Sequence, residues 1–258
     1  MPEGDTVYRT AKNLDAALAG HTLTRCDIRV PAFAAVDLTG DVVEGVISRG
    51  KHLLIRAGEH TVHSHLAMEG SWHLYRPQTR WRRPEWQARA ILGTEGWIAV
   101  GFRLGVLDVV ARGDETSVVG YLGPDLLGPD WDPGEALRRF TVDPAREVGL
   151  VLLDQRVMAG LGNVYRNELC FLSGVLPTRP VGDIANPARL VALAHRLIEA
   201  NKDRVDRTTT GTLRGDTNWV YRREGRPCLR CGTVIRRSRL GDTELELRDV
   251  YWCPRCQA

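Results

Sequence analysis

The sequence predicts a multidomain α+β fold: an N-terminal β-sandwich with a flanking N-terminal helix, a helical domain, and a C-terminal β-hairpin zinc finger. Three observations predict it. Short β-like segments separated by turn residues follow one another at nearly even spacing over the first 110 residues. After Pro133 the apolar residues recur at helical spacing instead. The C-terminal end of the chain holds two Cys-x-x-Cys pairs.

The N-terminal part begins with a predicted helix. Asp5 is a suitable N-cap, and apolar residues recur at helical spacing as far as Leu18, before Gly20 ends the helix. Eight strand-like runs follow, which is typical of a sandwich or a barrel. We expect strands over residues 22–30, 43–48, 52–56, 61–66, 71–75, 88–92, 97–102 and 106–110.

The middle part is predicted to be helical. Gly-Pro pairs at 123–124 and 128–129 indicate a linker out of the sandwich. Four helices are expected after it, over residues 134–140, 146–154, 163–172 and 187–201. The predicted domains are therefore a sandwich over 1–122, a linker over 123–133, a helical domain over 134–220 and a zinc finger over 221–258.

The C-terminal cysteines have the spacing of a metal site. Cys228 and Cys231 form one pair, and Cys253 and Cys256 form the other. Four thiolates in this pattern favour one structural Zn²⁺, and the intervening residues are long enough for a hairpin with strands over 232–237 and 244–252. The alternative is four unrelated buried cysteines, which the matched spacing argues against.

Composition excludes some classes of protein. No apolar stretch approaches the 18 residues that a transmembrane helix needs, and no secretion signal opens the chain of 258 residues. Cys26 and Cys170 lie in apolar segments and are predicted to be core thiols, so we expect a cytoplasmic protein. The net charge of +3 does not by itself indicate nucleic acid. Arginines at 236, 237 and 239 would give the finger either a phosphate-facing surface or merely a solvated one.

Two short segments carry further signals. Only three of the 35 basic residues are lysines, so Lys51 stands where a compact, titratable ammonium is useful. At 153–165 a predicted helix runs into Gly160 and Gly162 and a second begins at about Asn163. Glycines followed by a helix N-terminus suit a backbone phosphate, although a tight helix–helix connection without a ligand explains the same pattern.

These segments together resemble the Fpg/Nei DNA glycosylases, which include formamidopyrimidine-DNA glycosylase and endonuclease VIII. The resemblance rests on Pro2-Glu3-Gly4, on the segment 48–54 with Lys51, on the junction 152–163, and on the finger with Arg248. They occur in the family's order and cover nearly the whole chain. The Pro-Glu-Gly opening and the short segment between Asn201 and Tyr221 are more similar to the endonuclease VIII (Nei) branch. The resemblance implies a helix-two-turn-helix in the helical domain.

The resemblance also implies a catalytic set. After removal of Met1, the secondary amine of Pro2 would attack C1′ of the damaged nucleotide and form an iminium. Glu3 would act as general acid, Lys51 would contact phosphate and assist base expulsion, and Arg248 would clamp the phosphate beside the lesion. From position alone, Pro2 is only a residue small enough to permit removal of Met1, and Glu3 an exposed charge near a helix start.

A second implied set binds DNA. It contains Asn163 and Gly162 at the junction, Arg49 beside the hairpin lysine, and Met68 as a wedge that fills the gap left by the extruded base. A core methionine in a strand is the alternative for Met68.

The chain also departs from the family pattern. Asp5-Thr6 stands where many relatives have Pro-Glu, and Ala67-Met68-Glu69 keeps only the apolar centre of the Gln-Leu-Tyr trio of bacterial endonuclease VIII. No match to the Arg and Phe of the formamidopyrimidine branch is found near 101–108. These departures predict tolerance for single-stranded and bubble substrates.

The predicted function is a bifunctional DNA glycosylase and AP lyase of base excision repair. It would remove oxidised pyrimidines through a Schiff base on Pro2, with β,δ-elimination. Its expected partner is damaged DNA, in duplex, bubble or single-stranded form, and it would act as a cytoplasmic, nucleoid-associated monomer with one structural zinc. Three alternatives remain: a purine-directed glycosylase for 8-oxoguanine or formamidopyrimidines, a non-catalytic damage sensor, and a zinc-ribbon regulator.

Overall fold

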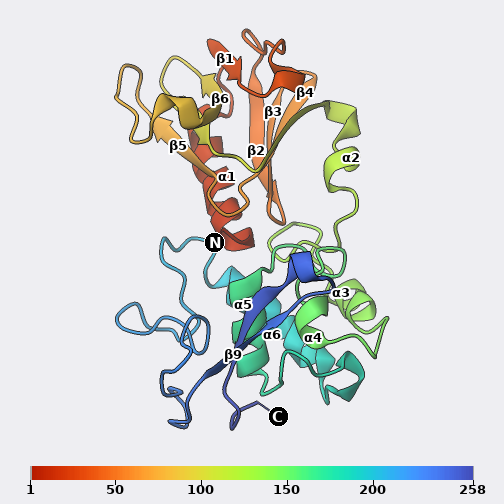
Figure 1. The fold of residues 1–258 in the computed structure, drawn as a ribbon. Coiled ribbons are helices and arrows are strands. Elements are labelled where there is room, and N and C mark those ends of the chain that lie inside the picture. Colours follow the sequence, from red (N-terminus) through yellow and green to blue (C-terminus); the bar gives the residue numbers. More distant parts are fainter. Residues whose placement is uncertain (1, 258) are drawn as a thin grey trace. The chain divides into compact units, whose positions relative to one another are not determined.

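The chain divides into two units, and the boundary lies between Tyr121 and Leu122. The structure, a computed structural model drawn in Figure 1, describes residues 2–257. No helix in that range is both long and apolar enough to cross a membrane. The two units are described separately.

The first unit is a sandwich of two antiparallel four-stranded sheets, as the sequence predicts. The first sheet has the order β1 (Arg25–Ile28), β6 (Ala88–Gly93), β7 (Ile98–Phe102), β5 (Ser71–Tyr75). The second has the order β2 (Val43–Arg49), β3 (His52–Ala57), β4 (His60–His65), β8 (Val106–Ala111). All eight expected strands occur. The first is shorter than the expected 22–30, because Thr22 makes only an isolated bridge to Val42.

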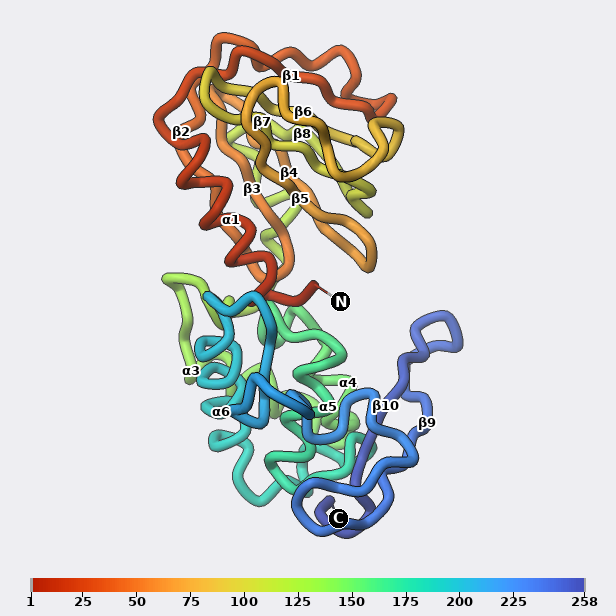
Figure 2. Tube along the Cα trace, turned by 90° about the vertical axis from the view of Figure 1, so that its left-hand side faces the viewer, coloured from red at the N-terminus to blue at the C-terminus, as the bar shows by residue number. Residues whose placement is uncertain are grey.

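Helix α1 (Gly4–Leu18) packs on this sandwich and lies beside β2 and β3 (Figure 2). Its buried face carries Val7, Ala11, Leu14 and Leu18, which join the main core of the unit. The predicted N-cap is wrong by two residues. Glu3, in extended conformation, is the N-cap, and Asp5 lies inside the first turn, where its carboxylate still favours the positive end of the helix dipole.

The second unit contains four helices: α3 (Pro133–Phe140), α4 (Val148–Val151), α5 (Asn163–Leu172) and α6 (Pro187–Glu199). Asp132 caps α3 by accepting from Gly134 N and Glu135 N, and Asn186 caps α6 by accepting from Arg189 N. Three of the predicted helices agree closely with these bounds.

The remaining predicted helix, over 146–154, is mostly wrong. Only α4 is helical, because the backbone beyond it is diverted into pairing with the start of the unit. Gly123 N donates to Gln155 O at 2.9 Å, and Ala159 N donates to Pro124 O at 3.0 Å. Residues 122–126, which lie partly within the predicted linker, are therefore buried parts of the second unit. The division into four domains stays a prediction.

The finger is a two-stranded antiparallel hairpin of β9 (Arg236–Leu240) and β10 (Arg248–Trp252). Both strands begin four residues later than predicted. Residues 228–235 instead form tight turns, in which Gly232 has a φ of +77° and donates to Cys228 O at 2.9 Å. Before β10, Glu244–Glu246 form a short 3₁₀ turn.

Glu168 of α5 holds the segment that leads into the finger. Its buried carboxylate accepts the backbone N–H groups of Trp219, Val220 and Tyr221 at 2.7–2.9 Å, and the hydroxyl of Thr209. Burial raises the pKa of this carboxyl, while the four donors act against that shift. The contact fixes the path of the chain between α5 and the cysteines.

Candidate active site and metal centre

The N-terminal residues lie at the start of α1. Pro2 is half-buried and directly precedes Glu3, whose backbone carbonyl accepts the first hydrogen bond of the helix from Val7 N at 3.0 Å. The Glu3 side chain is fully buried. The helix therefore gives the predicted nucleophile and acid a defined position, and a buried carboxyl suits proton transfer better than the exposed charge of the alternative.

Lys51 lies at the tip of the hairpin between β2 and β3. Arg49 and His52 pair across it, so Gly50 and Lys51 form a two-residue turn. Gly50 has a φ of +58°, as the first central residue of a type II′ turn requires. The tight turn gives Arg49 and Lys51 a rigid backbone, which favours a preorganised contact with a phosphate.

A chain of polar groups that the sequence did not reveal begins beside Lys51. His52 Nδ1 lies 2.7 Å from His63 Nε2, and His52 Nε2 lies 2.9 Å from the hydroxyl of Tyr121. At the other end, His63 Nδ1 lies 3.1 Å from the carboxylate of Asp108. His65 stacks edge-on against His52 at 5.1 Å. The strand register produces this cluster, because His52 pairs with His65 and His63 with Asp108.

The carboxylate fixes the direction of every hydrogen bond in this chain. Burial lowers the pKa of His63, and in the neutral ring Nδ1–H donates to Asp108 while Nε2 is an acceptor. His52 must then donate from Nδ1 and accept at Nε2, and the donor to it is the Tyr121 hydroxyl. This arrangement requires neutral imidazoles. Burial, the main cause, lowers the pKa of His52 to about 3 and that of His65 to about 4, and Lys51 acts in the same direction.

We expect this cluster to make the first unit sensitive to acid. Both imidazoles bind protons more weakly when folded than at their ordinary pKa of 6.5, so their contribution to stability is complete above about pH 6.5 and is lost as the pH falls toward 4. Between pH 8 and pH 5 each histidine should cost about 2 kcal/mol of unfolding free energy. Denaturant unfolding of the full chain at several pH values measures this loss.

Two variants separate this effect from general acid lability. His52→Gln should remove about 2 kcal/mol of the loss between pH 8 and pH 5, since glutamine does not titrate. The control is His60→Gln, because His60 is exposed on the same strand β4 as His63. An unchanged pH dependence in His52→Gln would contradict the assignment.

Met68 lies in the turn between β4 and β5, and 57% of its surface is exposed. It is therefore not a core methionine, and the wedge role stays a prediction. The next residue, Glu69, forms an ion pair at 2.6 Å with Arg103 of the turn between β7 and β8. Arg103 is half-exposed and lies in the segment 101–108, where no match to the Arg and Phe of the formamidopyrimidine branch is expected.

In the second unit, the start of α5 is joined to the start of β10. Asn163 Nδ2 donates to Asp249 O at 3.0 Å, and the guanidinium of Arg166 donates to the side chain of Asn163. Gly162, the N-cap of α5, is buried, and Asn163 is only 5% exposed. Arg248, the neighbour of Asp249, is exposed and forms no ion pair within residues 2–257. The structure thus places the backbone of Arg248 next to the start of α5, and the phosphate contact of its guanidinium stays a prediction.

The junction before α5 is held by one side chain. Gln155 donates to Leu153 O and Leu161 O at 2.7 and 3.0 Å and accepts from Gly160 N at 3.1 Å. Gly160 has a φ of +115°, which only glycine adopts readily. The predicted glycine junction is therefore a fixed turn.

The four C-terminal cysteines form one cluster. All four sulfurs lie within 4.8 Å of one another, and the Cys228–Cys256 and Cys231–Cys253 separations are 3.9 and 3.4 Å. A Zn–S bond of 2.3 Å in a tetrahedron places its sulfurs about 3.8 Å apart, within this range. These separations are far too long for a disulfide. Arg230 N also donates to Cys228 Sγ at 3.4 Å, as expected for a thiolate acceptor. The donor set fits a metal ion with no open coordination position.

Comparison with known families identifies this arrangement. Residues 1–107 match the sequence model of the formamidopyrimidine-DNA glycosylase N-terminal domain, and residues 122–213 match that of the formamidopyrimidine-DNA glycosylase H2TH domain. The chain belongs to the Fpg/Nei family of DNA glycosylases. This confirms the predicted class of enzyme, a DNA glycosylase and AP lyase, and the predicted fold.

The curated relatives include members of the endonuclease VIII branch. "Probable endonuclease 8 2" of Streptomyces coelicolor is 56% identical, over all of this chain and 94% of that protein. "DNA-(apurinic or apyrimidinic site) lyase Nei2" of Mycolicibacterium smegmatis is 53% identical, over all of this chain and 99% of that protein. A formamidopyrimidine-DNA glycosylase of Methylococcus capsulatus is 33% identical over both full lengths.

Solved structures show the same fold. A complex of Lactococcus lactis Fpg with DNA containing an abasic site superposes with a TM-score of 0.81 at 20% identity, over 99% of each chain. A complex of MutM with DNA containing carbocyclic 8-oxoguanine superposes with a TM-score of 0.82 at 21% identity.

Proposed function

We propose that this protein is a bifunctional DNA glycosylase and AP lyase that removes oxidised pyrimidines and cleaves the strand by β,δ-elimination. The observation that carries the proposal is the fixed placement of Pro2 and Glu3 at the start of α1 in a chain of this family. Damaged DNA is the proposed partner, with the enzyme acting as a cytoplasmic, nucleoid-associated monomer. The endonuclease 8 names of relatives at 53–56% identity support the pyrimidine branch.

The proposed chemistry begins with the Pro2 amine. An α-amino group has a reference pKa of about 8, so a useful fraction is neutral near pH 7. Its attack on C1′ expels the base and leaves an iminium, a permanent positive charge that acidifies the neighbouring C2′ protons. Glu3 protonates the opening deoxyribose ring and moves protons in the later steps. Loss of the C2′ proton then expels the 3′ phosphate, and a second elimination expels the 5′ phosphate.

The remaining residues hold the DNA. Lys51 and Arg49 at the hairpin tip and Arg248 on β10 would bind phosphates, with Asn163 and Gly162 fixing the start of α5. Met68 would fill the stack after base extrusion. We propose Zn²⁺ on Cys228, Cys231, Cys253 and Cys256, where it would hold the finger and take no part in the reaction.

Borohydride trapping tests the function. Reduction converts the iminium into a stable cross-link between protein and DNA, so oligonucleotides with an abasic site or thymine glycol should give a trapped band, and 8-oxoguanine a weaker one. A stronger band with 8-oxoguanine would favour the purine-directed alternative, which the relative at 33% identity keeps open. DNA binding without a band on any substrate would overturn the enzyme and favour a damage sensor.

A further inference from the structure

The loop between β5 and β6, residues 76–87, concentrates positive charge on the first unit. It carries Arg76, Arg80, Arg82 and Arg83 against a single acid, Glu85. Within residues 2–257 none of these four arginines forms an ion pair, whereas Glu85 is already bound by Arg29 at 3.1 Å. The loop therefore has an uncompensated charge that attracts a polyanion.

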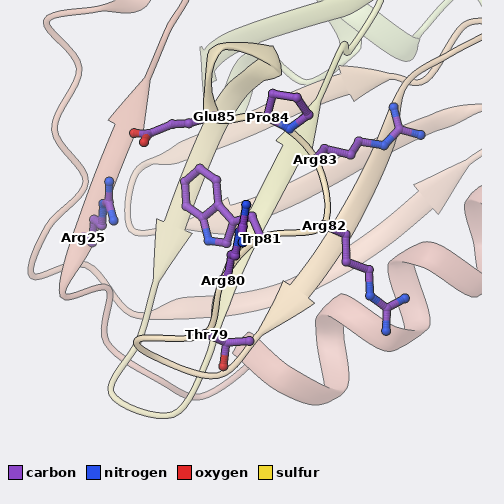
Figure 3. A pocket seen from close by; sticks show the side chains of 8 residues that line it. All are labelled: Arg25, Thr79, Arg80, Trp81, Arg82, Arg83, Pro84 and Glu85. Carbon is purple, nitrogen blue, oxygen red and sulfur yellow. The ribbon is translucent and has the colours of Figure 1, made fainter.

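Two hollows lie along this loop. The first, of about 600 Å³, is lined by residues 79–85 and Arg25 (Figure 3). The second, of about 730 Å³, lies between the loop and helix α1 and includes Arg9 and Asn13 of the helix. Thr79, Arg80 and Arg82 line both hollows, so the two form one continuous surface, which we call the arginine track.

Each hollow contains a tryptophan. Trp81 lies between the arginines of the first hollow (Figure 3). Its ring packs on Tyr75 and Phe102 at centroid distances of 6.2 and 5.9 Å. Trp97 lines the second hollow and is stacked by the guanidinium of Arg76 at 3.8 Å. Both rings are held in place by neighbours, so stacking a planar group against the track costs little side-chain entropy.

The arginines of the track also act on a neighbouring histidine. His73 also lines the second hollow, and its pKa is lowered by burial first and then by the charges of Arg83 and Arg82. These charges thus act on the interior of the hollow, where a bound anion would lie.

We propose that the arginine track binds single-stranded nucleic acid, with arginines on phosphates and bases against the indoles. The combination favours this ligand over two others. A duplex keeps its bases stacked inside, so the indoles would have no partner, and an acidic peptide would use the charge but not the rings. The track begins at Arg9, about 8 Å along α1 from the helix start at Gly4. A strand flanking the nucleotide at Pro2 can therefore continue along the same helix.

The inference goes beyond the proposed function, because the track binds undamaged DNA and performs no chemistry. The test variant is Arg80→Gln/Arg82→Gln/Arg83→Gln. The charge-matched control is Arg89→Gln/Arg189→Gln/Arg196→Gln, which changes exposed arginines outside both hollows and outside any ion pair within residues 2–257. Fluorescence anisotropy with a labelled 20-nucleotide oligothymidylate, from 50 to 300 mM salt, measures binding by the full chain.

The track variant should bind oligothymidylate at least about tenfold more weakly at low salt. The slope of log K against log salt should become less negative by about 2, or roughly 0.7 for each lost phosphate contact. The control should show less than half of each change. Binding of both variants to a blunt duplex with an abasic analogue should match the unaltered chain. Equal losses in track variant and control, or on duplex and single strand, would overturn the proposal.

Two further measurements complete the test. Decaglutamate should not displace oligothymidylate at equal charge concentration; displacement would assign an acidic protein partner and overturn the nucleic-acid proposal. Lyase activity on the blunt abasic duplex is measured in parallel. Absence of that activity in the unaltered chain would refute the proposed function while leaving the binding result, and with it the track, intact.

Discussion

Pro2→Leu is expected to abolish borohydride trapping and strand cleavage at an abasic site. A large second residue retains the initiator methionine, so the terminal amine moves by one residue, at most about 3.6 Å, and becomes primary. The reaction depends on a secondary amine whose iminium carries a permanent charge. Gel analysis of trapped product measures the loss, and the intact mass establishes whether Met1 is present.

The matched variant Pro2→Ala keeps a small second residue and a free amine at the same place. Its imine is charged only when protonated, so we expect slow trapping that weakens as the pH rises, in contrast to complete loss in Pro2→Leu. Both variants should bind a duplex with an abasic analogue as well as the unaltered chain. Full trapping in Pro2→Leu would exclude the terminal amine as the nucleophile and would favour the amine of Lys51 instead.

Removal of the metal is expected to unfold the finger and abolish tight DNA binding. Structural zinc in such sites contributes about 10–16 kcal/mol, more than a small hairpin can replace. The amide of Tyr251 in β10, which donates to Asn167 Oδ1 at 2.6 Å, should lose its hydrogen-exchange protection after chelation. Amides in β3 and β4 should stay protected, because they lie in the first unit with its own core.

Substitutions separate the metal from other thiol effects. Cys253→Ser should reduce the metal content below one zinc per chain, measured by atomic emission. Cys26→Ala should leave one zinc in place, since Cys26 is a thiol of the first unit outside the cluster. A purified chain without metal that still protects Tyr251 and binds DNA would contradict the zinc assignment.

Local signals in the sequence were sufficient for most of the fold. Short β-like segments separated by turn residues predicted all eight strands of the sandwich, because strand-forming and turn-forming residues act on the backbone locally. Helix α5 begins at the predicted Asn163 because glycines end the preceding turn. The helix predicted over 146–154 is realised only at Val148–Val151, and the backbone just beyond the segment, at Gln155 and Ala159, pairs with residues 123–126, a contact between distant parts of the chain that no local period encodes.

The candidate site also has one part that the sequence predicts and another part that only the structure shows. The sequence alone determined the residue types and spacing: Pro2-Glu3 at the terminus, Lys51 after Gly50, and four paired cysteines. Only the tertiary structure decided the groups that depend on strand register, namely the neutral histidine chain from Asp108 to Tyr121, the pairing of Glu69 with Arg103, and the arginine track. The physical reason is range: turn and ligand chemistry act over a few residues, whereas hydrogen bonds and fields across a sheet join residues far apart in sequence.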